Sequence, residues 1–121
     1  MSTAPLIIPG AAPDGTPRSR SPAIELDHLA RQTMGDKDVA RDVLVMFAGL
    51  ARTCMDELRV ADEAGCEAIA HRLLGSARGV GAFAVADAAE ALKSGPDREA
   101  GLAALAAAVL EAENFIREHC G

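Results

Sequence analysis

The residue best suited to chemistry in this chain is His71, which lies four residues before Gly75 in a stretch that otherwise favours a helix. Glycine inside a helix costs about 1 kcal/mol relative to alanine, so its presence needs a physical reason. One turn from the histidine, a missing side chain leaves room for a bulky group to approach the ring. Neutral imidazole is a competent nucleophile near neutral pH. The pattern therefore predicts a site that carries a phosphoryl group on His71.

A helical wheel at about 100° per residue places His71 opposite the apolar stripe of its helix. With His71 at zero, Ile69, Leu73 and Val80 fall between roughly 160° and 200°, which predicts an imidazole facing solvent. The residues that share the face of His71 are Glu67, Ala68, Leu74, Gly75 and Arg78. His28 and His119 lack such a setting, and we predict that both are ordinary surface residues.

A phosphorylated ring needs cations or hydrogen-bond donors near the phosphoryl oxygens. Arg78, two turns after His71, and Arg72, about 100° around the helix, are the candidate cations. Glu67, four residues before His71, is predicted to accept a hydrogen bond from the other ring nitrogen and fix its tautomer. Ser76 lies nearer the core stripe, where its hydroxyl could instead bond a backbone carbonyl. The three charged residues are also compatible with an ordinary solvated surface.

The segment resembles the histidine-containing phosphotransfer (Hpt) domain family. The motif of that family is His-x-Leu-Lys-Gly-Ser/Ala, with a further Gly ten residues after the His. The residues at matching places are His71, Leu73, Gly75, Ser76 and Gly81. The preceding Leu26-Asp27, the Gly35-Asp36 pair and the helix with Phe47 and Leu58 are also similar to the usual lead-in of that family. The resemblance covers about residues 23 to 118.

The resemblance implies a phosphorelay intermediate. It would accept a phosphoryl group on His71 from a receiver-domain aspartyl phosphate and pass it reversibly to another receiver aspartate. Its partners would be response-regulator receiver domains and a hybrid or sensor histidine kinase. It would be a phosphocarrier rather than an enzyme, with no ATP site and no cofactor of its own, because the receiver supplies the Mg²⁺. The alternatives are an adaptor that binds a receiver or histidine kinase without transfer, and a structural bundle with no relay role.

One residue departs from the family motif. Leu74 occupies the place of the usual lysine, so the expected cation is missing unless Arg72 or Arg78 replaces it. We expect Leu74 to join Ala68 and Gly75 in an apolar receiver-docking patch with exposed side chains of the preceding helix, such as Val45. A partly packed aliphatic side chain is the other interpretation. Slower transfer or an altered partner preference would follow from this departure.

The periodicity of the apolar residues predicts the elements that position this site. We expect an all-α fold, an up-and-down antiparallel four-helix bundle with a short additional N-terminal helix. The expected helices span residues 25–33, about 36–64, 66–79, 83–93 and 96–118, with Gly65 as the break after the second. The predicted buried stripe of the second helix consists of Val39, Val43, Met46, Phe47, Leu50, Cys54, Leu58 and Ala61.

Composition limits the remaining possibilities. Residues 1–22 hold five of the six prolines and show no helical period, so we expect a disordered tail followed by one bundle domain over 23–121. A net charge of −6 argues against nucleic-acid and anionic-membrane partners. Three cysteines without CxxC spacing, and no second Glu-x-x-His pair, predict neither a disulfide framework nor a metal site. A reduced cytoplasmic monomer fits these features.

Overall fold

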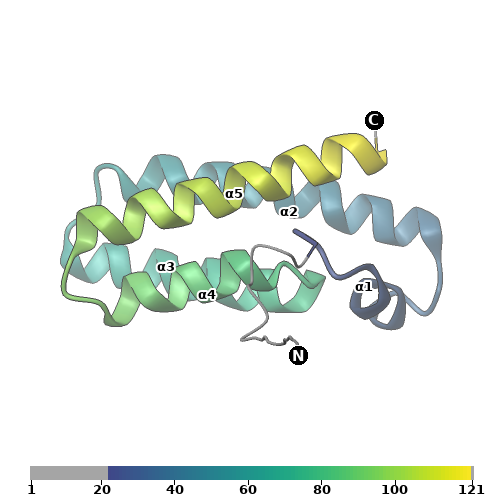
Figure 1. Cartoon of the computed structure of the whole chain (residues 1–121), viewed down its shortest axis with the longest axis horizontal. Coiled ribbons are helices and arrows are strands. Elements are labelled where there is room, and N and C mark those ends of the chain that lie inside the picture. The colour runs from purple at the N-terminus through teal and green to yellow at the C-terminus, as the bar shows by residue number, and fades with distance from the viewer. Residues whose placement is uncertain (1–21, 121) are drawn as a thin grey trace, which may run out of the picture.

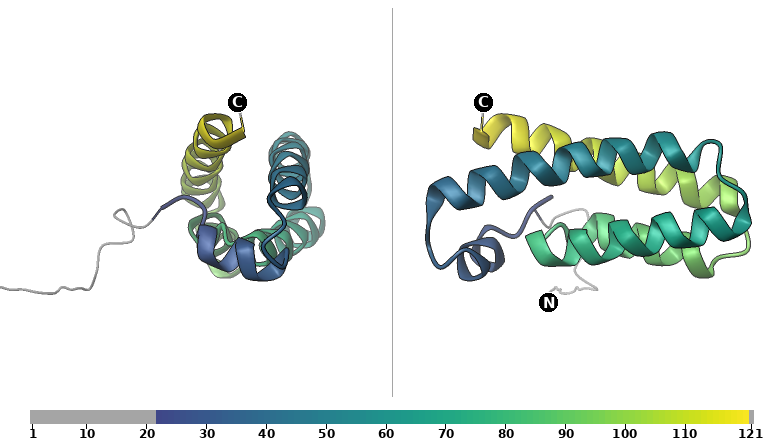
Figure 2. Two further views of the ribbon diagram at one scale, coloured as in Figure 1. Left: turned by 90° about the vertical axis from the view of Figure 1, so that its right-hand side faces the viewer. Right: turned by 180° about the vertical axis from the view of Figure 1, so that it is seen from behind.

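The computed structural model describes residues 22–120, and the predicted tail up to residue 21 lies outside it. The described part of the chain contains five helices joined by short connections. They are α1 (Leu26–Gln32), α2 (Lys37–Leu58), α3 (Glu63–Val80), α4 (Phe83–Ser94) and α5 (Arg98–Cys120). The described residues contain no strand, so the all-α prediction is confirmed. The four longer helices lie side by side, consecutive ones run in opposite directions, and α1 lies across one end (Figures 1 and 2).

One cluster of buried apolar side chains fills the space between the helices. In α3 and α4, which contact each other most extensively, much of that buried surface is alanine: Ala70, Ala77, Ala86 and Ala89. Small side chains let two helix backbones approach closely. The antiparallel α3–α4 hairpin therefore brings the last turn of α4 beside the middle of α3.

Capping aspartates fix where two helices begin. Asp36 accepts hydrogen bonds from the first-turn N–H groups of α2 at 3.0 and 3.1 Å, and Asp62 accepts one from the Gly65 N–H at 2.8 Å. Such caps satisfy donors that have no partner within the helix. Gly65 therefore lies in the first turn of α3, and the prediction that it breaks the second helix was wrong.

The second helix ends six residues earlier than predicted, at Leu58. The guanidinium of Arg98, at the start of α5, donates to the Leu58 carbonyl at 3.2 Å and to the Ala61 carbonyl at 2.6 Å. These bonds satisfy carbonyls that a helix end leaves without partners. Because the donor comes from a helix 40 residues later in the chain, local sequence does not mark this end.

The buried stripe of α2 is rotated from the predicted one. Phe47, Cys54 and Leu58 are buried as expected, but Val39 and Met46 are 44% and 73% exposed. Leu44 and Ala51 fill the core in their place. Steps of three and four fit more than one stripe on a helix rich in apolar residues, so periodicity alone did not choose between them.

Gly81 ends α3 in the left-handed region, with φ of 89°, and its carbonyl accepts a hydrogen bond from the Glu25 N–H at 2.9 Å. A Cβ at this position would lie 2.9 Å from the Glu25 carbonyl oxygen, closer than real Cβ atoms ordinarily come. Backbone conformation and close approach therefore both require glycine here. This glycine of the motif has a structural role, and it anchors the segment before α1 to the end of α3.

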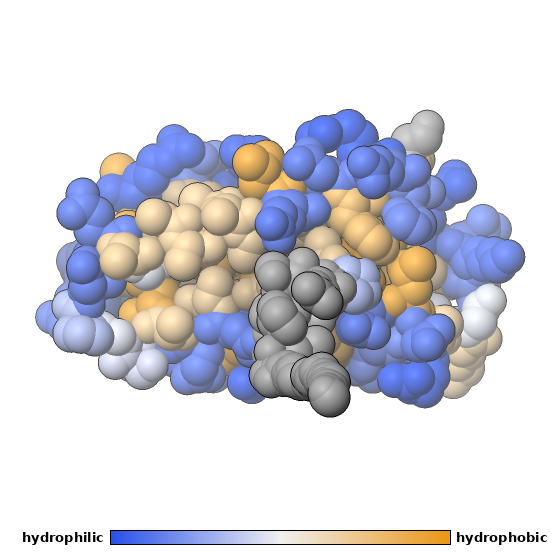
Figure 3. Space-filling view, in the orientation of Figure 1, coloured by the Kyte–Doolittle hydropathy of each residue, from blue (hydrophilic) through white to orange (hydrophobic). Residues whose placement is uncertain are grey.

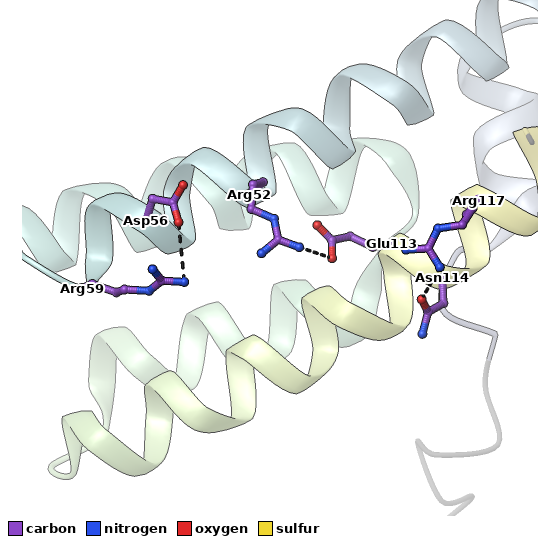
Figure 4. Close-up of polar contacts among 6 residues, drawn as sticks. All are labelled: Arg52, Asp56, Arg59, Glu113, Asn114 and Arg117. Atoms are coloured by element: carbon purple, nitrogen blue, oxygen red, sulfur yellow. Dashed lines mark hydrogen bonds and ion pairs between the residues drawn. The ribbon is translucent and has the colours of Figure 1, made fainter.

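Polar contacts also link α2 to α5 (Figure 4). The Arg52 guanidinium lies 2.7 Å from a Glu113 carboxylate oxygen and joins the two helices. Of the other two contacts drawn there, Arg59 with Asp56 lies at the C-terminal end of α2, and Arg117 with Asn114 lies within α5. Since Arg52 is largely exposed, this pair contributes little to stability.

The surface of the bundle is mixed in polarity. Figure 3 shows pale orange, moderately hydrophobic residues among charged ones on the face where α5 lies in front. The exposed residues of α5 include Ala103, Ala104 and Ala107. No helix among residues 22–120 has both the length and the apolar character needed to cross a membrane. His28, predicted to lie on the surface, is half-buried, with its ring edge-on to Phe83 at 5.2 Å.

Candidate functional site

His71 lies near the middle of α3 and is exposed, as predicted. The buried residues of α3 are Cys66, Ala70, Leu73, Leu74, Ala77 and Val80. Their mean direction is about 235° on the wheel with His71 at zero, whereas the prediction from Ile69, Leu73 and Val80 was about 180°. His71 is therefore not opposite the core. It lies toward the α4 side of the exposed face.

Lys93, in the last turn of α4, is the residue that contacts the imidazole. Its Nζ lies 3.1 Å from His71 Nδ1, and its side chain is half-buried. Sequence reasoning missed this residue, which lies outside the motif on another helix. A signal was available, because the two helices join at Gly81 and Ala82. His71 and Lys93 lie nearly equal distances from that junction, and such residues meet in an antiparallel hairpin.

The contact assigns roles to the ring nitrogens. A lysine ammonium has three N–H donors and no acceptor, so Lys93 donates and Nδ1 accepts. In the neutral ring the proton then resides on Nε2. No hydrogen bond joins Glu67 to the ring among the described residues, and Nδ1 contacts Lys93 instead, so the prediction that Glu67 fixes the tautomer was wrong. Glu67 remains exposed and borders, with Lys93, a hollow of about 270 Å³.

The two predicted substitute cations are engaged elsewhere. Arg72 points to α2, where its guanidinium lies 2.7 Å from Glu57 Oε1 and 3.5 Å from Cys54 Sγ. The hydrogen bond to Cys54, followed by that to Glu57, raises the pKa of the Arg72 guanidinium above its ordinary value. Arg78 lies 3.6 Å from a carboxylate oxygen of Glu90 on α4. Neither arginine contacts His71 in this arrangement.

Leu74 is not a docking residue. It is 3% exposed and belongs to the core cluster, so its predicted place in an exposed apolar patch was wrong. At about 300° on the wheel it falls inside the buried arc once that arc is centred at about 235°. Val45, its expected neighbour, is 55% exposed but lines a hollow with Arg52 and Glu113, between α2 and α5.

Ala68 and Gly75 are both exposed on α3, as predicted. A Cβ built on Gly75 meets no atom within 4 Å, so packing inside the protein does not require glycine there. The absent side chain keeps the surface beside His71 low. Ser76 is half-buried and borders an apolar groove of about 360 Å³ between α2 and α3. The other residues that line this groove are Val43, Met46, Phe47, Leu50 and Val80.

The site thus consists of the exposed His71 imidazole, with the Lys93 ammonium in contact with Nδ1. Beside the ring, Gly75 carries no side chain, so the surface there does not project. Among the described residues, no group of three or more His, Cys, Asp and Glu side chains is placed to hold a metal ion. Comparison of the chain with protein-family models, with curated proteins and with solved structures found no match. The chemistry of His71 and its surroundings therefore carries the functional argument.

Proposed function

We propose that the chain is a histidine phosphotransfer protein of the Hpt type, with His71 as phosphoryl acceptor and donor. The observation that carries the proposal is the exposed His71 imidazole beside Gly75, a helical glycine that no internal contact requires. A glycine that destabilises its own helix without serving the packing is explained by the approach of an external group. The Hpt motif, matched by His71, Leu73, Gly75 and Ser76, indicates that this external group is a phosphoryl group.

The proposed step is a phosphoryl exchange between an aspartate and an imidazole. The P–O bond of the receiver's aspartyl phosphate breaks as the P–N bond to the ring forms. The receiver carboxylate is regenerated. The attack uses the lone pair of an unprotonated ring nitrogen, and the ring gives up its N–H proton to solvent. In the reverse direction the P–N bond breaks and the ring recovers a proton. Mg²⁺ belongs to the receiver, and the chain needs no ATP or cofactor of its own.

The receiver would dock over the exposed part of α3 and its border with α2. Ala68 and Gly75 leave a low surface next to His71, and the α2–α3 groove adds apolar area, with Met46 73% exposed. An apolar surface rimmed by charged residues is typical of transient protein partners. The partners in this proposal are receiver domains of response regulators and a hybrid or sensor histidine kinase, and the setting is the cytoplasm.

The test incubates the full chain with phosphorylated receiver domains and follows acid-labile, base-stable label. Wild type is expected to take up label, and His71→Gln is expected to lose it entirely, because glutamine has no nucleophilic ring nitrogen. The matched control is His119→Gln, which removes an exposed ring near the end of α5 and is expected to retain transfer. Label on wild type that persists in His71→Gln would contradict the assignment.

A second candidate function is an adaptor that binds a receiver or histidine kinase without transfer. The observation that favours it is Leu74, which is buried where the Hpt motif has a lysine. Tight receiver binding with no label on wild type would support the adaptor. If the wild type shows neither receiver binding nor label, the remaining interpretation is a structural bundle with no relay role.

A further inference from the structure

Lys93 is a charged residue whose environment the Hpt motif does not explain. Its ammonium contacts the His71 ring at 3.1 Å, and among residues 22–120 no carboxylate forms an ion pair with it. The other cations near this part of α3, Arg72 and Arg78, each have a carboxylate partner. A lysine that gives up part of its hydration for a neutral ring nitrogen needs a further source of stabilisation, and an anion on that ring would supply it.

We propose that Lys93 holds Nδ1 of His71 as a hydrogen-bond acceptor and thereby stabilises the ring phosphorylated on Nε2, which makes the phosphohistidine long-lived. The inference rests on the proposed phosphocarrier function. Lys93, on α4, is then a positioning residue. It affects the lifetime of the phosphoryl group on His71 rather than the rate at which His71 is phosphorylated.

Nδ1 accepts from Lys93 both before and after phosphorylation. In the free neutral ring Nε2 carries the proton, and a protonated ring nitrogen has no lone pair in the ring plane. Attack by Nε2 therefore requires that this proton pass to solvent as the Nε2–P bond forms. The lone pair of Nδ1 still accepts from Lys93 in the phosphorylated ring. The ammonium also offsets the negative charge that the phosphoryl group brings to the ring. Lys93 therefore donates to Nδ1 in both states.

The lifetime follows from the leaving group. A phosphorylated imidazole that takes a proton on Nδ1 releases its phosphoryl group readily, because a neutral ring departs. Without that proton an imidazolate would have to leave, which is much slower. Because Lys93 occupies the lone pair of Nδ1, it competes with this activating proton. A receiver would have to displace or outcompete Lys93 to withdraw the phosphoryl group quickly.

The surrounding charges do not replace this role. On α3 itself, Glu67 is exposed, and Arg72 is paired with Glu57 of α2. Arg78 is paired with Glu90 of α4. Lys93 is therefore the charged group in hydrogen-bond contact with the ring on the side of the adjacent helix.

The first experiment reads the ring directly by long-range ¹H–¹⁵N NMR on the unphosphorylated full chain. Wild type is expected to show the Nε2–H tautomer of His71, and Lys93→Glu is expected to shift the ring toward Nδ1–H, because a carboxylate accepts rather than donates. An Nδ1–H tautomer in wild type, or identical spectra for the two proteins, would overturn the inference. This readout needs no phosphoryl donor.

The second experiment uses phosphoramidate as a small donor, so that no receiver docking is involved. Its P–N bond breaks, the P–N bond to His71 forms, and the departing nitrogen leaves as ammonia with the ring proton. After removal of the donor, the decay of phosphohistidine is followed at pH 6 and pH 8 in wild type, Lys93→Met and Lys93→Arg. Circular dichroism confirms that each variant is folded.

Lys93→Met is expected to shorten the lifetime about three- to tenfold at pH 6, the range for loss of one hydrogen bond. The difference should narrow at pH 8, where protons are scarce, and Lys93→Arg should restore most of the lifetime. An unchanged or longer lifetime in Lys93→Met would overturn the role of Lys93 while leaving the phosphocarrier function intact. Absence of label on wild type would instead count against the phosphocarrier function itself.

Discussion

The two flanks of α3 treat their basic residues differently. On the α2 flank, Arg72 meets Glu57 at 2.7 Å, so opposite charges compensate each other. On the α4 flank, Arg78 is also paired with Glu90, but His71 meets Lys93 at 3.1 Å, so at that point two basic groups face each other. A compensated pair is complete without a ligand, whereas two basic groups leave room for a negative charge. The comparison indicates that the chemistry of α3 lies at the His71–Lys93 contact, the point on the α4 flank where the positive charge has no carboxylate partner among the described residues.

The largest expected effect is a loss of stability from a substitution in the core beneath the α4 flank. Phosphoryl transfer should not change. Leu74→Ala is expected to lower the free energy of unfolding by about 3 kcal/mol, because it removes a buried side chain and leaves a cavity. Chemical denaturation measures this loss, and Leu110→Ala, at a 54% exposed position, is the matched control. A small loss at Leu74 would return it to the role of an exposed docking residue and weaken the contrast between flanks.

The next effect tests the clearance beside His71. Gly75→Gln is expected to slow phosphoryl transfer from a receiver about tenfold or more, since the new side chain obstructs the approach to the ring. The fold should be as stable or more stable, because glycine costs a helix about 1 kcal/mol relative to alanine.

The matched control for that variant is Gly79→Gln, at a second exposed glycine of α3 where an added Cβ also meets no atom within 4 Å. Thermal unfolding by circular dichroism measures stability for both variants. Lost helicity in Gly75→Gln, or equal slowing in both, would refute a local clearance at Gly75.

The smallest effect belongs to the compensated flank. Arg72→Met is expected to change phosphorylation of His71 by phosphoramidate less than about twofold and to shift Tm by no more than a few degrees, because exposed ion pairs contribute little. Lys93→Met, assayed in parallel, is the contrasting variant. A loss of phosphohistidine lifetime in Arg72→Met as large as in Lys93→Met would erase the distinction between the flanks.

Most of the fold could be predicted from local patterns. The helical class, the start of α2 beside Asp36 and, to within one residue, the end of α3 follow from periodicity and from residues whose preferences are local. The end of α2 could not be predicted in the same way, because Arg98 of α5 satisfies its carbonyls. Long-range contacts of this kind leave no mark in the neighbouring sequence.

The features of the site that depend on α3 alone were predicted from the sequence. The exposure of His71, Ala68 and Gly75 follows from the wheel of one helix. The roles assigned to Glu67 and Leu74 were wrong because the direction of the core depends on where α4 packs, which a single wheel does not contain. Motif reasoning also looked for the missing cation near the motif, whereas the nearest ammonium comes from the adjacent helix.

The bond between Glu25 and Gly81 sets where a fusion partner would enter the molecule. The chain joins the bundle beside the C-terminal end of α3, because the Glu25 N–H binds the Gly81 carbonyl at 2.9 Å. Ten helical residues, about 15 Å, separate that point from His71. A receiver domain joined ahead of Pro22 by a short flexible linker would meet the imidazole at an effective concentration of about millimolar. Phosphoryl exchange in such a fusion would be first order, with a rate independent of dilution.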